Sequence, residues 1–210
     1  MSLNTGEPII YLITSGEATP ENFDRTSREI LDIVRVAVEA GVSIIQLREK
    51  HLSARQLFEL AVEAAKITRE SSTRLLVNDR ADIALAAKAD GVHLAANSLP
   101  VKIIRGNFPS DFIIGASAHT LEAARSAADN GADFAVFGPV FETPGKGEPQ
   151  GLEILAEVCG DLHPFPVMGL GGIDESNYST VLEAGASGFA AIRFLNDSEK
   201  LRTVCRDLRK

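Results

Sequence analysis

Cationic and hydrogen-bonding side chains follow a series of short apolar runs in this chain. Arginine and lysine bind phosphate oxygens, and arginine can hold two of them at once. The whole chain of 210 residues has a net charge of −8, so the grouping of these side chains predicts a small anionic ligand. The residues concerned are Gln46, Arg48, Lys50, Asn78, Asp79, Arg80, His93, Ser117, His119, Thr143, Lys146 and Arg193.

The segment Gln46–Lys50 alternates in a way that could bind a phosphate or a diphosphate. In an extended chain Gln46, Arg48 and Lys50 share one face, while Leu47 and Glu49 share the other. The alternative is a strand end that runs into solvent with its charges paired.

A glycine cluster, Gly169-Leu170-Gly171-Gly172-Ile173, precedes a helix expected to begin near Asp174. Glycines let backbone N–H groups approach an oxyanion closely, and a helix N-terminus adds a favourable dipole. The cluster therefore predicts phosphate binding at Gly171 and Gly172, and a tight turn without a ligand is the alternative.

Two histidines and one acidic residue could take part in chemistry. His119 could carry a proton, because the unperturbed pKa of histidine is near 6.5, or it could be a helix cap or surface residue. His93 lies in an apolar run, where a core histidine and a ligand contact are both open. Asp79, next to Asn78, could hold Mg²⁺ through one carboxylate, or the pair could cap a helix.

Short β-branched runs alternate with Ala- and Leu-rich segments of helical period. The predicted strands are Ile9–Thr14, Ser43–Arg48, Arg74–Asn78, Gly91–Leu94, Phe112–Ala116, Phe134–Phe137, Pro166–Gly169 and Gly188–Ile192. The predicted helices are Asp24–Ala40, Ser53–Arg69, Arg80–Ala87, Leu121–Asn130, Leu152–Val158, Asn177–Ala184 and Asp197–Leu208. Ser53 and Thr120 are predicted N-caps, and Gly41, Gly131 and Gly185 are predicted to follow helix ends.

Eight strands with seven or eight helices predict a single (β/α)8 barrel over residues 1–210, with residues 1–7 as a flexible N-terminus. An open doubly wound sheet is the alternative, but the turn Ser15–Pro20 lacks the dinucleotide fingerprint. In a (β/α)8 barrel the strands end at one mouth, where the polar residues would converge.

Composition excludes several classes of protein. The chain is 45% hydrophobic and 24% charged, as globular proteins are, and its acidity disfavours nucleic-acid binding. No apolar run is long enough to span a bilayer, and no secretory signal is visible, so we expect a cytoplasmic protein without a membrane partner.

The motifs of this chain, taken in order, resemble those of the thiamin-phosphate synthase/TenI family. The resemblance covers essentially the whole chain and implies a (β/α)8 barrel that handles a thiazole phosphate in thiamin biosynthesis. It rests on Gln46-Leu47-Arg48-Glu49-Lys50, Asn78-Asp79-Arg80, Gly91-Val92-His93-Leu94, Ser117-Ala118-His119-Thr120, Gly138-Pro139-Val140-Phe141-Glu142-Thr143, Gly171-Gly172-Ile173 and Ala184-Gly185-Ala186.

The family has two chemistries. Synthases join hydroxymethylpyrimidine diphosphate to the thiazole phosphate with Mg²⁺ and release diphosphate, and Asp79 would be a metal ligand. TenI-like members aromatise a carboxythiazole phosphate without a cofactor, and His119 would move the proton. By resemblance the pyrimidine and diphosphate pocket would comprise Gln46, Arg48, Lys50, Asn78, His93, Ser117, Thr143 and Lys146. The thiazole phosphate would contact Gly171, Gly172, Ile192 and Arg193.

One departure favours the tautomerase. Synthases usually follow the Gly-Val-His segment with a Gly-Gln-acid-Asp run, whose last Asp is the second magnesium ligand. This chain has Ala95-Ala96-Asn97-Ser98 there, which removes electrostatic support for the leaving diphosphate. We therefore expect a thiazole tautomerase, with the synthase as the alternative and a non-catalytic barrel that binds thiazole phosphates as a third. A homodimer is the expected oligomer, because dimers are the commonest assemblies.

Overall fold

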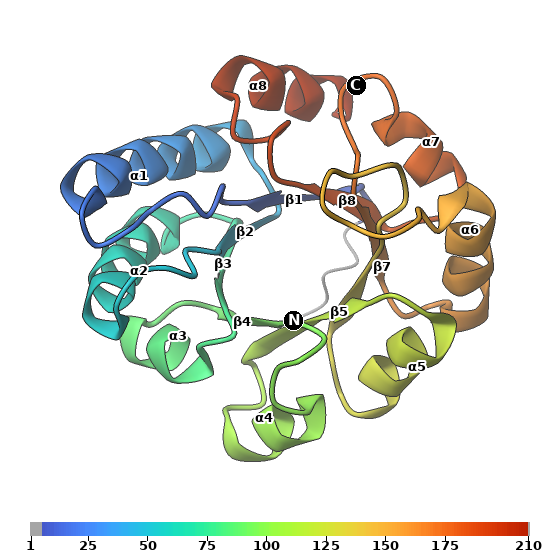
Figure 1. The fold of residues 1–210 in the computed structure, drawn as a ribbon, viewed down its shortest axis with the longest axis horizontal. Helices are drawn as coiled ribbons and strands as arrows, with labels where there is room; N and C mark the ends of the chain where they lie inside the picture. Colours follow the sequence, from blue (N-terminus) through green and yellow to red (C-terminus); the bar gives the residue numbers. More distant parts are fainter. Residues whose placement is uncertain (1–5, 210) are drawn as a thin grey trace. The chain divides into compact units, whose positions relative to one another are not determined.

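The computed structural model describes residues 6–209, in which strands and helices alternate along the chain (Figure 1). The strands are β1 (Ile9–Ile13), β2 (Ile44–Leu47), β3 (Arg74–Asn78), β4 (Gly91–Leu94), β5 (Ile113–Ala118), β6 (Phe134–Phe137), β7 (Val167–Leu170) and β8 (Gly188–Ala191). The helices are α1 (Phe23–Ala40), α2 (Ala54–Thr68), α3 (Ala81–Ala87), α4 (Val101–Asn107), α5 (Leu121–Asp129), α6 (Gly151–Leu162), α7 (Tyr178–Glu183) and α8 (Ser198–Asp207).

The eight strands form a closed barrel in sequence order, which confirms the predicted (β/α)8 fold and excludes the open sheet. Each strand is short and almost wholly buried, as expected where helices cover a parallel sheet. The flexible N-terminus predicted for residues 1–7 falls mostly on residues 1–5, which lie outside the described residues. None of the helices in residues 6–209 is long and apolar enough to cross a membrane.

The predicted strand boundaries agree with the structure to within two residues, and three strands match at both ends. The predicted helix caps at Ser53, Thr120 and Gly41 are also confirmed. Ser53 forms a capping box with Gln56, and the Thr120 hydroxyl accepts a hydrogen bond from the backbone N–H of Ala123. Gly41 ends α1 in the left-handed conformation, as expected.

Three helix predictions were wrong. Helix α4 was missed, because only Ile104 of its seven residues is buried and no apolar stripe marks it. Helix α6 runs four residues past the predicted end at Val158, through Gly160, which interrupts the apolar period. No helix begins near Asp174, since residues 174–177 form a turn and α7 begins only at Tyr178.

By its internal contacts the chain divides into two compact units. We call residues Tyr11–His93 with 192–209 the β2–β4 unit, and residues 6–10 with Leu94–Ala191 the β5–β8 unit. In the β2–β4 unit, α1 packs against α2 and α8, and α2 packs against α3. In the β5–β8 unit, α5 packs on β5 and β6, and α6 contacts α5 and α7.

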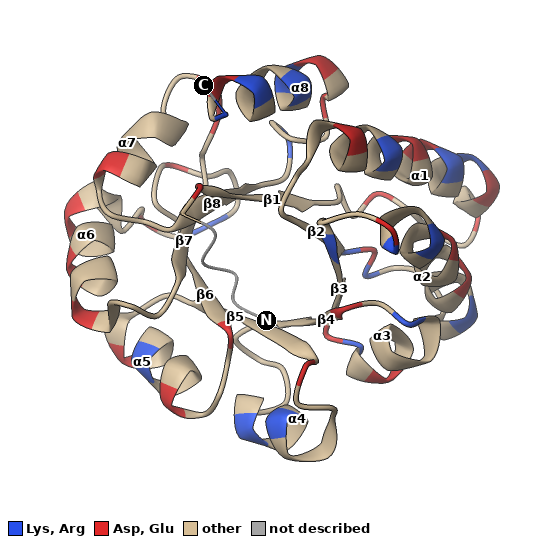
Figure 2. Ribbon diagram, turned by 180° about the vertical axis from the view of Figure 1, so that it is seen from behind, with Lys and Arg blue, Asp and Glu red and all other residues tan. Residues whose placement is uncertain are grey.

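Two helices of the β5–β8 unit, α6 and α7, differ in charge from the helices of the β2–β4 unit. Lys and Arg lie among acidic residues on α1, α2 and α8 of the β2–β4 unit, whereas α6 and α7 carry acidic residues and no basic ones (Figure 2).

Candidate functional site

A chain of side-chain hydrogen bonds crosses three strands of the β2–β4 unit. The Tyr11 hydroxyl donates to Oε1 of Gln46 at 2.8 Å, and Nε2 of Gln46 donates to Oδ1 of Asn78 at 2.8 Å. Nδ2 of Asn78 then donates to Oδ2 of Asp79 at 2.9 Å. The sequence-predicted residues Gln46, Asn78 and Asp79 are therefore brought together, and each amide has one orientation that satisfies its neighbours.

Asp79 is held in an unusual backbone conformation. It follows β3 with φ 57°, in the left-handed region that a residue other than glycine seldom occupies. Its backbone N–H donates to the carbonyl oxygen of His93 at 3.0 Å, and its side chain accepts from Asn78. Strained conformations that the surroundings enforce are frequent at functional sites, which supports Asp79 as a functional residue.

His93 lies opposite Asn78 in the paired strands β3 and β4 and is only 3% exposed. Burial lowers the pKa of His93 from 6.5 to about 4, and the charge of Asp79 acts in the opposite direction. Its ring meets that of Tyr11 edge-on, with ring centres 5.8 Å apart. His93 is thus a neutral, buried histidine at neutral pH, and its ligand contact stays a prediction.

Glu49 ties the end of β2 to the loop after β1. It is 2% exposed, and its carboxylate accepts hydrogen bonds from the Thr14 hydroxyl and from the backbone N–H groups of Gly16 and Ala18. Thr14 in turn accepts from the backbone N–H of Arg48 at 2.8 Å. A Cβ on Gly16 would lie 2.9 Å from Nη1 of Arg48, so the loop backbone and the guanidinium are in close contact.

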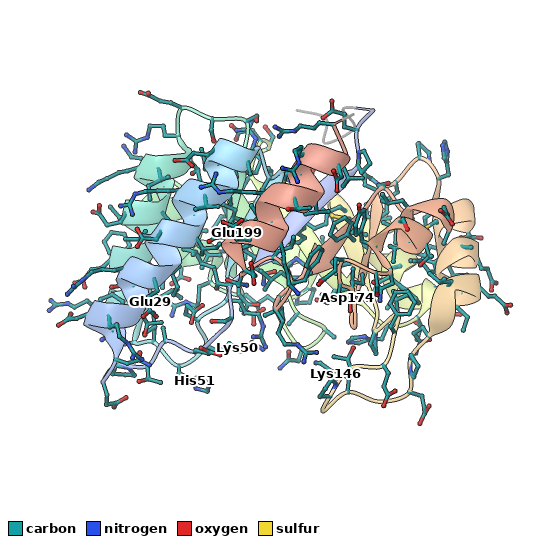
Figure 3. The ribbon with its side chains drawn as sticks, turned by 90° about the horizontal axis from the view of Figure 1, so that it is seen from above. Glu29, Lys50, His51, Lys146, Asp174 and Glu199 are labelled. Atoms are coloured by element: carbon teal, nitrogen blue, oxygen red, sulfur yellow. The ribbon has the colours of Figure 1, made fainter. Side chains whose placement is uncertain are left out.

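β2 ends at Leu47, so the strand is shorter than the extended segment predicted over Gln46–Lys50, and a shared face for Gln46, Arg48 and Lys50 stays a prediction. Gln46 is buried, Arg48 is half-buried, and Lys50 is exposed in the turn that also carries His51 (Figure 3). The hydrogen bonds of Glu49, rather than strand geometry, set the course of the chain here.

The turn that follows β8 belongs to the β2–β4 unit. Ile192 is half-buried and Arg193 is exposed in the turn that precedes α8. Nδ2 of Asn196 donates to the carbonyl oxygens of Ile13 and Ile192, at 2.8 and 2.7 Å. Asn196 therefore links this turn to the end of β1, and contact of Ile192 and Arg193 with a thiazole phosphate stays a prediction.

In the β5–β8 unit, His119 follows β5 and is exposed. Nδ1 of His119 lies 2.5 Å from the carbonyl oxygen of Gly138, which can only accept a hydrogen bond. Nδ1 therefore carries the hydrogen, and Nε2 is the basic nitrogen. Among the described residues Nε2 of His119 has no hydrogen-bond partner, so it is available to a ligand.

A cleft of about 490 Å³ opens beside His119. It is lined by Ser98 from the segment after β4, by Ser117 of β5, and by residues of α4 and α5 that include Lys102. The predicted residues Ser117 and His119 thus face one cleft, together with Ser98.

The glycines after β7 pack against the segment after β6. A Cβ on Gly172, where φ is 65°, would lie 2.6 Å from the carbonyl oxygen of Glu142, and one on Gly171 would meet Pro139 at 2.6 Å. The carbonyl oxygen of Gly171 accepts a hydrogen bond from the N–H of Phe141, and that of Gly172 accepts one from Nδ2 of Asn177. In residues 6–209 the N–H groups of Gly171 and Gly172 have no hydrogen-bond acceptor, which suits an oxyanion. The helix dipole expected there is missing, because the segment from Asp174 is a turn.

Thr143 and Lys146 lie on the loop between β6 and α6. The Thr143 hydroxyl donates to the carbonyl oxygen of Phe141 at 2.9 Å, and the N–H of Lys146 donates to the carbonyl oxygen of Thr143. The loop extends beyond the turn that carries Asp174, with the Lys146 side chain exposed (Figure 3). The roles predicted for both residues stay predictions.

Sequence reasoning missed Tyr11 and Glu49. Tyr11 stands among aliphatic residues of a strand, and Glu49 stands between Arg48 and Lys50, so neither stood out in the sequence. A tyrosine in an otherwise aliphatic run is a usable signal, because a buried hydroxyl needs a partner.

Comparison with known proteins gives consistent matches. Residues 10–195 match the family model described as thiamine monophosphate synthase. The chain is 40% identical over 191 residues to the thiamine-phosphate synthase of Roseiflexus sp. (90% of this chain, 78% of the relative). It is 40% identical over 186 residues to that of Syntrophomonas wolfei (87% and 88%). Among solved structures, the thiamine phosphate pyrophosphorylase from Pyrococcus furiosus superposes with a TM-score of 0.79 at 32% identity, covering 96% of this chain and 97% of that one.

Proposed function

Because the chain belongs to the thiamine monophosphate synthase family, we propose that this enzyme is a thiamine-phosphate synthase, which joins hydroxymethylpyrimidine diphosphate to a thiazole phosphate and releases diphosphate. The tautomerase preferred from the sequence is less well supported, because the named relatives are synthases. The observation that carries the proposal is the hydrogen-bonded set of Gln46, Asn78 and Asp79.

In the β2–β4 unit this set would bind the pyrimidine diphosphate. Gln46 and Asn78 have amide N–H groups, and Arg48 has a guanidinium that can bind two phosphate oxygens. Lys50, which follows Arg48 by two residues in the chain, is exposed and would add charge. Negative charge develops on the departing diphosphate, so fixed cations and donors at that end would accelerate the reaction.

The residues present fit a magnesium ion. Mg²⁺ is commonly held by one or two carboxylates together with substrate phosphates and water, and Asp79 offers a carboxylate oriented by Asn78. Residues 6–209 contain no cluster of three or more His, Cys, Asp or Glu, and a metal held largely by phosphate needs none. When bound at Asp79, Mg²⁺ would neutralise charge on the diphosphate.

In the β5–β8 unit, the N–H groups of Gly171 and Gly172 would bind the thiazole phosphate. The roles predicted for Ser117, Thr143 and Lys146 in binding a phosphorylated substrate stay predictions. Ser98 would give a neutral hydroxyl where synthases usually have a carboxylate. We expect weaker magnesium binding as a result, because a neutral oxygen attracts a dication less than a carboxylate does.

A second candidate is the thiazole tautomerase. It is favoured by the geometry of His119, whose Nδ1 is held by Gly138 and whose basic Nε2 has no partner among the described residues. A histidine oriented in this way could accept and return a proton, which typically contributes about 10²–10⁴-fold to a rate.

One assay separates the two functions. The purified protein is incubated with Mg²⁺ and thiazole phosphate, with or without hydroxymethylpyrimidine diphosphate, and released diphosphate is measured. We expect release only when both substrates are present. The tautomerase would replace the synthase if no diphosphate is released and if the protein aromatises a carboxythiazole phosphate in a reaction that His119→Ala abolishes.

The homodimer and the cytoplasmic location stay predictions. Analytical sedimentation can test the homodimer.

A further inference from the structure

The hydroxyl of Tyr11 is unusual in its position. Tyr11 is 0% exposed in the middle of β1, whose other residues are Ile9, Ile10, Leu12 and Ile13. Burial raises its pKa well above the usual value, so the hydroxyl keeps its proton at any working pH. Phenylalanine would pack as well without a buried polar atom, so packing alone does not account for the hydroxyl.

The directions of the hydrogen bonds from Tyr11 to Asp79 indicate what the Tyr11 hydroxyl does. An ionised Asp79 only accepts, so Asn78 must turn its amide nitrogen to Asp79 and its oxygen to Gln46. Gln46 must then present its nitrogen to Asn78, which leaves its oxygen toward β1. The Tyr11 hydroxyl donates to that oxygen and completes the series.

We propose that Tyr11 is a positioning residue, whose buried hydroxyl fixes the orientation of the Gln46 and Asn78 amides and thereby of the Asp79 carboxylate toward a magnesium diphosphate. The proposal rests on the proposed function, and it gives the β1 strand a part in binding that neither charge nor exposure would reveal. Tyr11 acts through the other side chains, and Asp79 meets the ligand.

Removal of the hydroxyl has a definite consequence. In Tyr11→Phe the buried Gln46 oxygen loses its donor, so the Gln46 amide is held only by its bond to Asn78 and is freer to move. If Gln46 turns, its oxygen faces the oxygen of Asn78, which must turn in response. The oxygen of Asn78 would then face the Asp79 carboxylate, so the ordered arrangement at the ligand end would be lost.

The first test measures binding and does not depend on turnover. Calorimetry with MgCl₂ and inorganic diphosphate compares the wild type with Tyr11→Phe and with Tyr178→Phe, which changes the only other tyrosine of the chain. Tyr178 packs against Phe189 outside the proposed binding residues. We expect about tenfold weaker binding for Tyr11→Phe, because one hydrogen bond is lost. We expect unchanged binding for Tyr178→Phe.

A double-mutant cycle separates positioning from general destabilisation. Gln46→Met cuts the series at its second link, so in that background Tyr11→Phe should produce no further loss of binding. An equal loss in both backgrounds would overturn the proposal, as would unchanged binding in the single Tyr11→Phe variant. Thermal unfolding of each variant shows whether it is folded under the conditions of the calorimetry.

The kinetic counterpart distinguishes this proposal from the synthase itself. In Tyr11→Phe the KM for pyrimidine diphosphate should rise about tenfold, while the KM for thiazole phosphate stays the same. If the wild type binds magnesium diphosphate but releases no diphosphate in the synthase assay, the proposed function is refuted. The calorimetric comparison would still test the positioning role of Tyr11. A wild type that does not bind magnesium diphosphate would refute the positioning role.

Discussion

The two units place their polar groups in different ways. In the β2–β4 unit the residues that would meet a ligand come from strand ends and are fixed by bonds between side chains, from Tyr11 through Gln46 and Asn78 to Asp79. In the β5–β8 unit the corresponding groups are backbone N–H groups of glycines and exposed side chains on loops. A ligand site of the first kind should respond to the change of single polar atoms, and one of the second kind to added Cβ atoms.

The largest effect should come from the carboxylate at the end of the hydrogen-bonded series. Asp79→Asn keeps the size of the side chain and removes its charge, so we expect kcat/KM for diphosphate release to fall about 10²–10³-fold. Steady-state kinetics over a range of Mg²⁺ concentrations measures this. Asp82→Asn is the matched control, because Asp82 lies three residues later, is 64% exposed and pairs only with Arg80 in the contacts described. Equal activity of the two variants would remove Asp79 from the site.

The next effect concerns stability and pH. Folding lowers the pKa of His93 to about 4, so between pH 6.5 and pH 4 the unfolded chain binds a proton that the folded chain excludes. Stability from this group is complete above pH 6.5 and is lost as the pH falls toward 4, by about 3 kcal/mol in total.

Urea unfolding of the wild type and of His93→Gln at pH 7 and pH 4.5 measures this contribution. The difference in unfolding free energy between the two proteins should shrink at the lower pH. His163→Gln, which changes an exposed histidine in the β5–β8 unit, is the control for the loss of a histidine elsewhere in the chain. A constant difference for His93→Gln would show that burial of this ring does not exclude its proton.

In the β5–β8 unit the sensitive position is Gly172. An alanine there would be strained by its φ of 65° and would place Cβ 2.6 Å from the Glu142 carbonyl oxygen, so the loop must move. Because a displacement of about 1 Å can cost about 10²-fold in activity, we expect the KM for thiazole phosphate to rise about 10–100-fold.

The control for this prediction is Gly185→Ala, where φ is 89° and the nearest atom to the new Cβ would be 3.7 Å away. It carries the same conformational penalty without the contact, so its KM should match the wild type. A similar rise of KM in both variants would mean that the effect comes from destabilisation.

Periodicity predicted the barrel, because alternating buried strands and amphipathic helices leave a repeated signal along the chain. It failed for α4, where one buried residue, Ile104, gives no stripe. It placed the helix predicted at Asn177–Ala184 correctly, whereas the helix start near Asp174, expected from the glycine cluster, was wrong. Residue chemistry predicted Gln46, Asn78 and Asp79, which the structure joins by hydrogen bonds, and the role of His119 stays a prediction. Residue chemistry missed Tyr11 and Glu49, because their importance arises from partners 31 to 35 residues away that only folding brings into contact.

The smallest effect compares one helix cap from each unit. Ser53 in the β2–β4 unit forms the reciprocal pair of capping-box hydrogen bonds with Gln56 and a third bond between the two side chains. Thr120 in the β5–β8 unit accepts one hydrogen bond from the N–H of Ala123. Loss of a cap costs about 1 kcal/mol of stability, so Ser53→Ala and Thr120→Ala should each lower the unfolding free energy by about that amount, Ser53→Ala by more. Ser53→Thr and Thr120→Ser keep the accepting oxygen and should restore most of the loss in urea unfolding. If Thr120→Ala is the more damaging, reciprocal bonding in the capping box adds nothing, because the single bond at Thr120 would then be worth as much as the pair at Ser53.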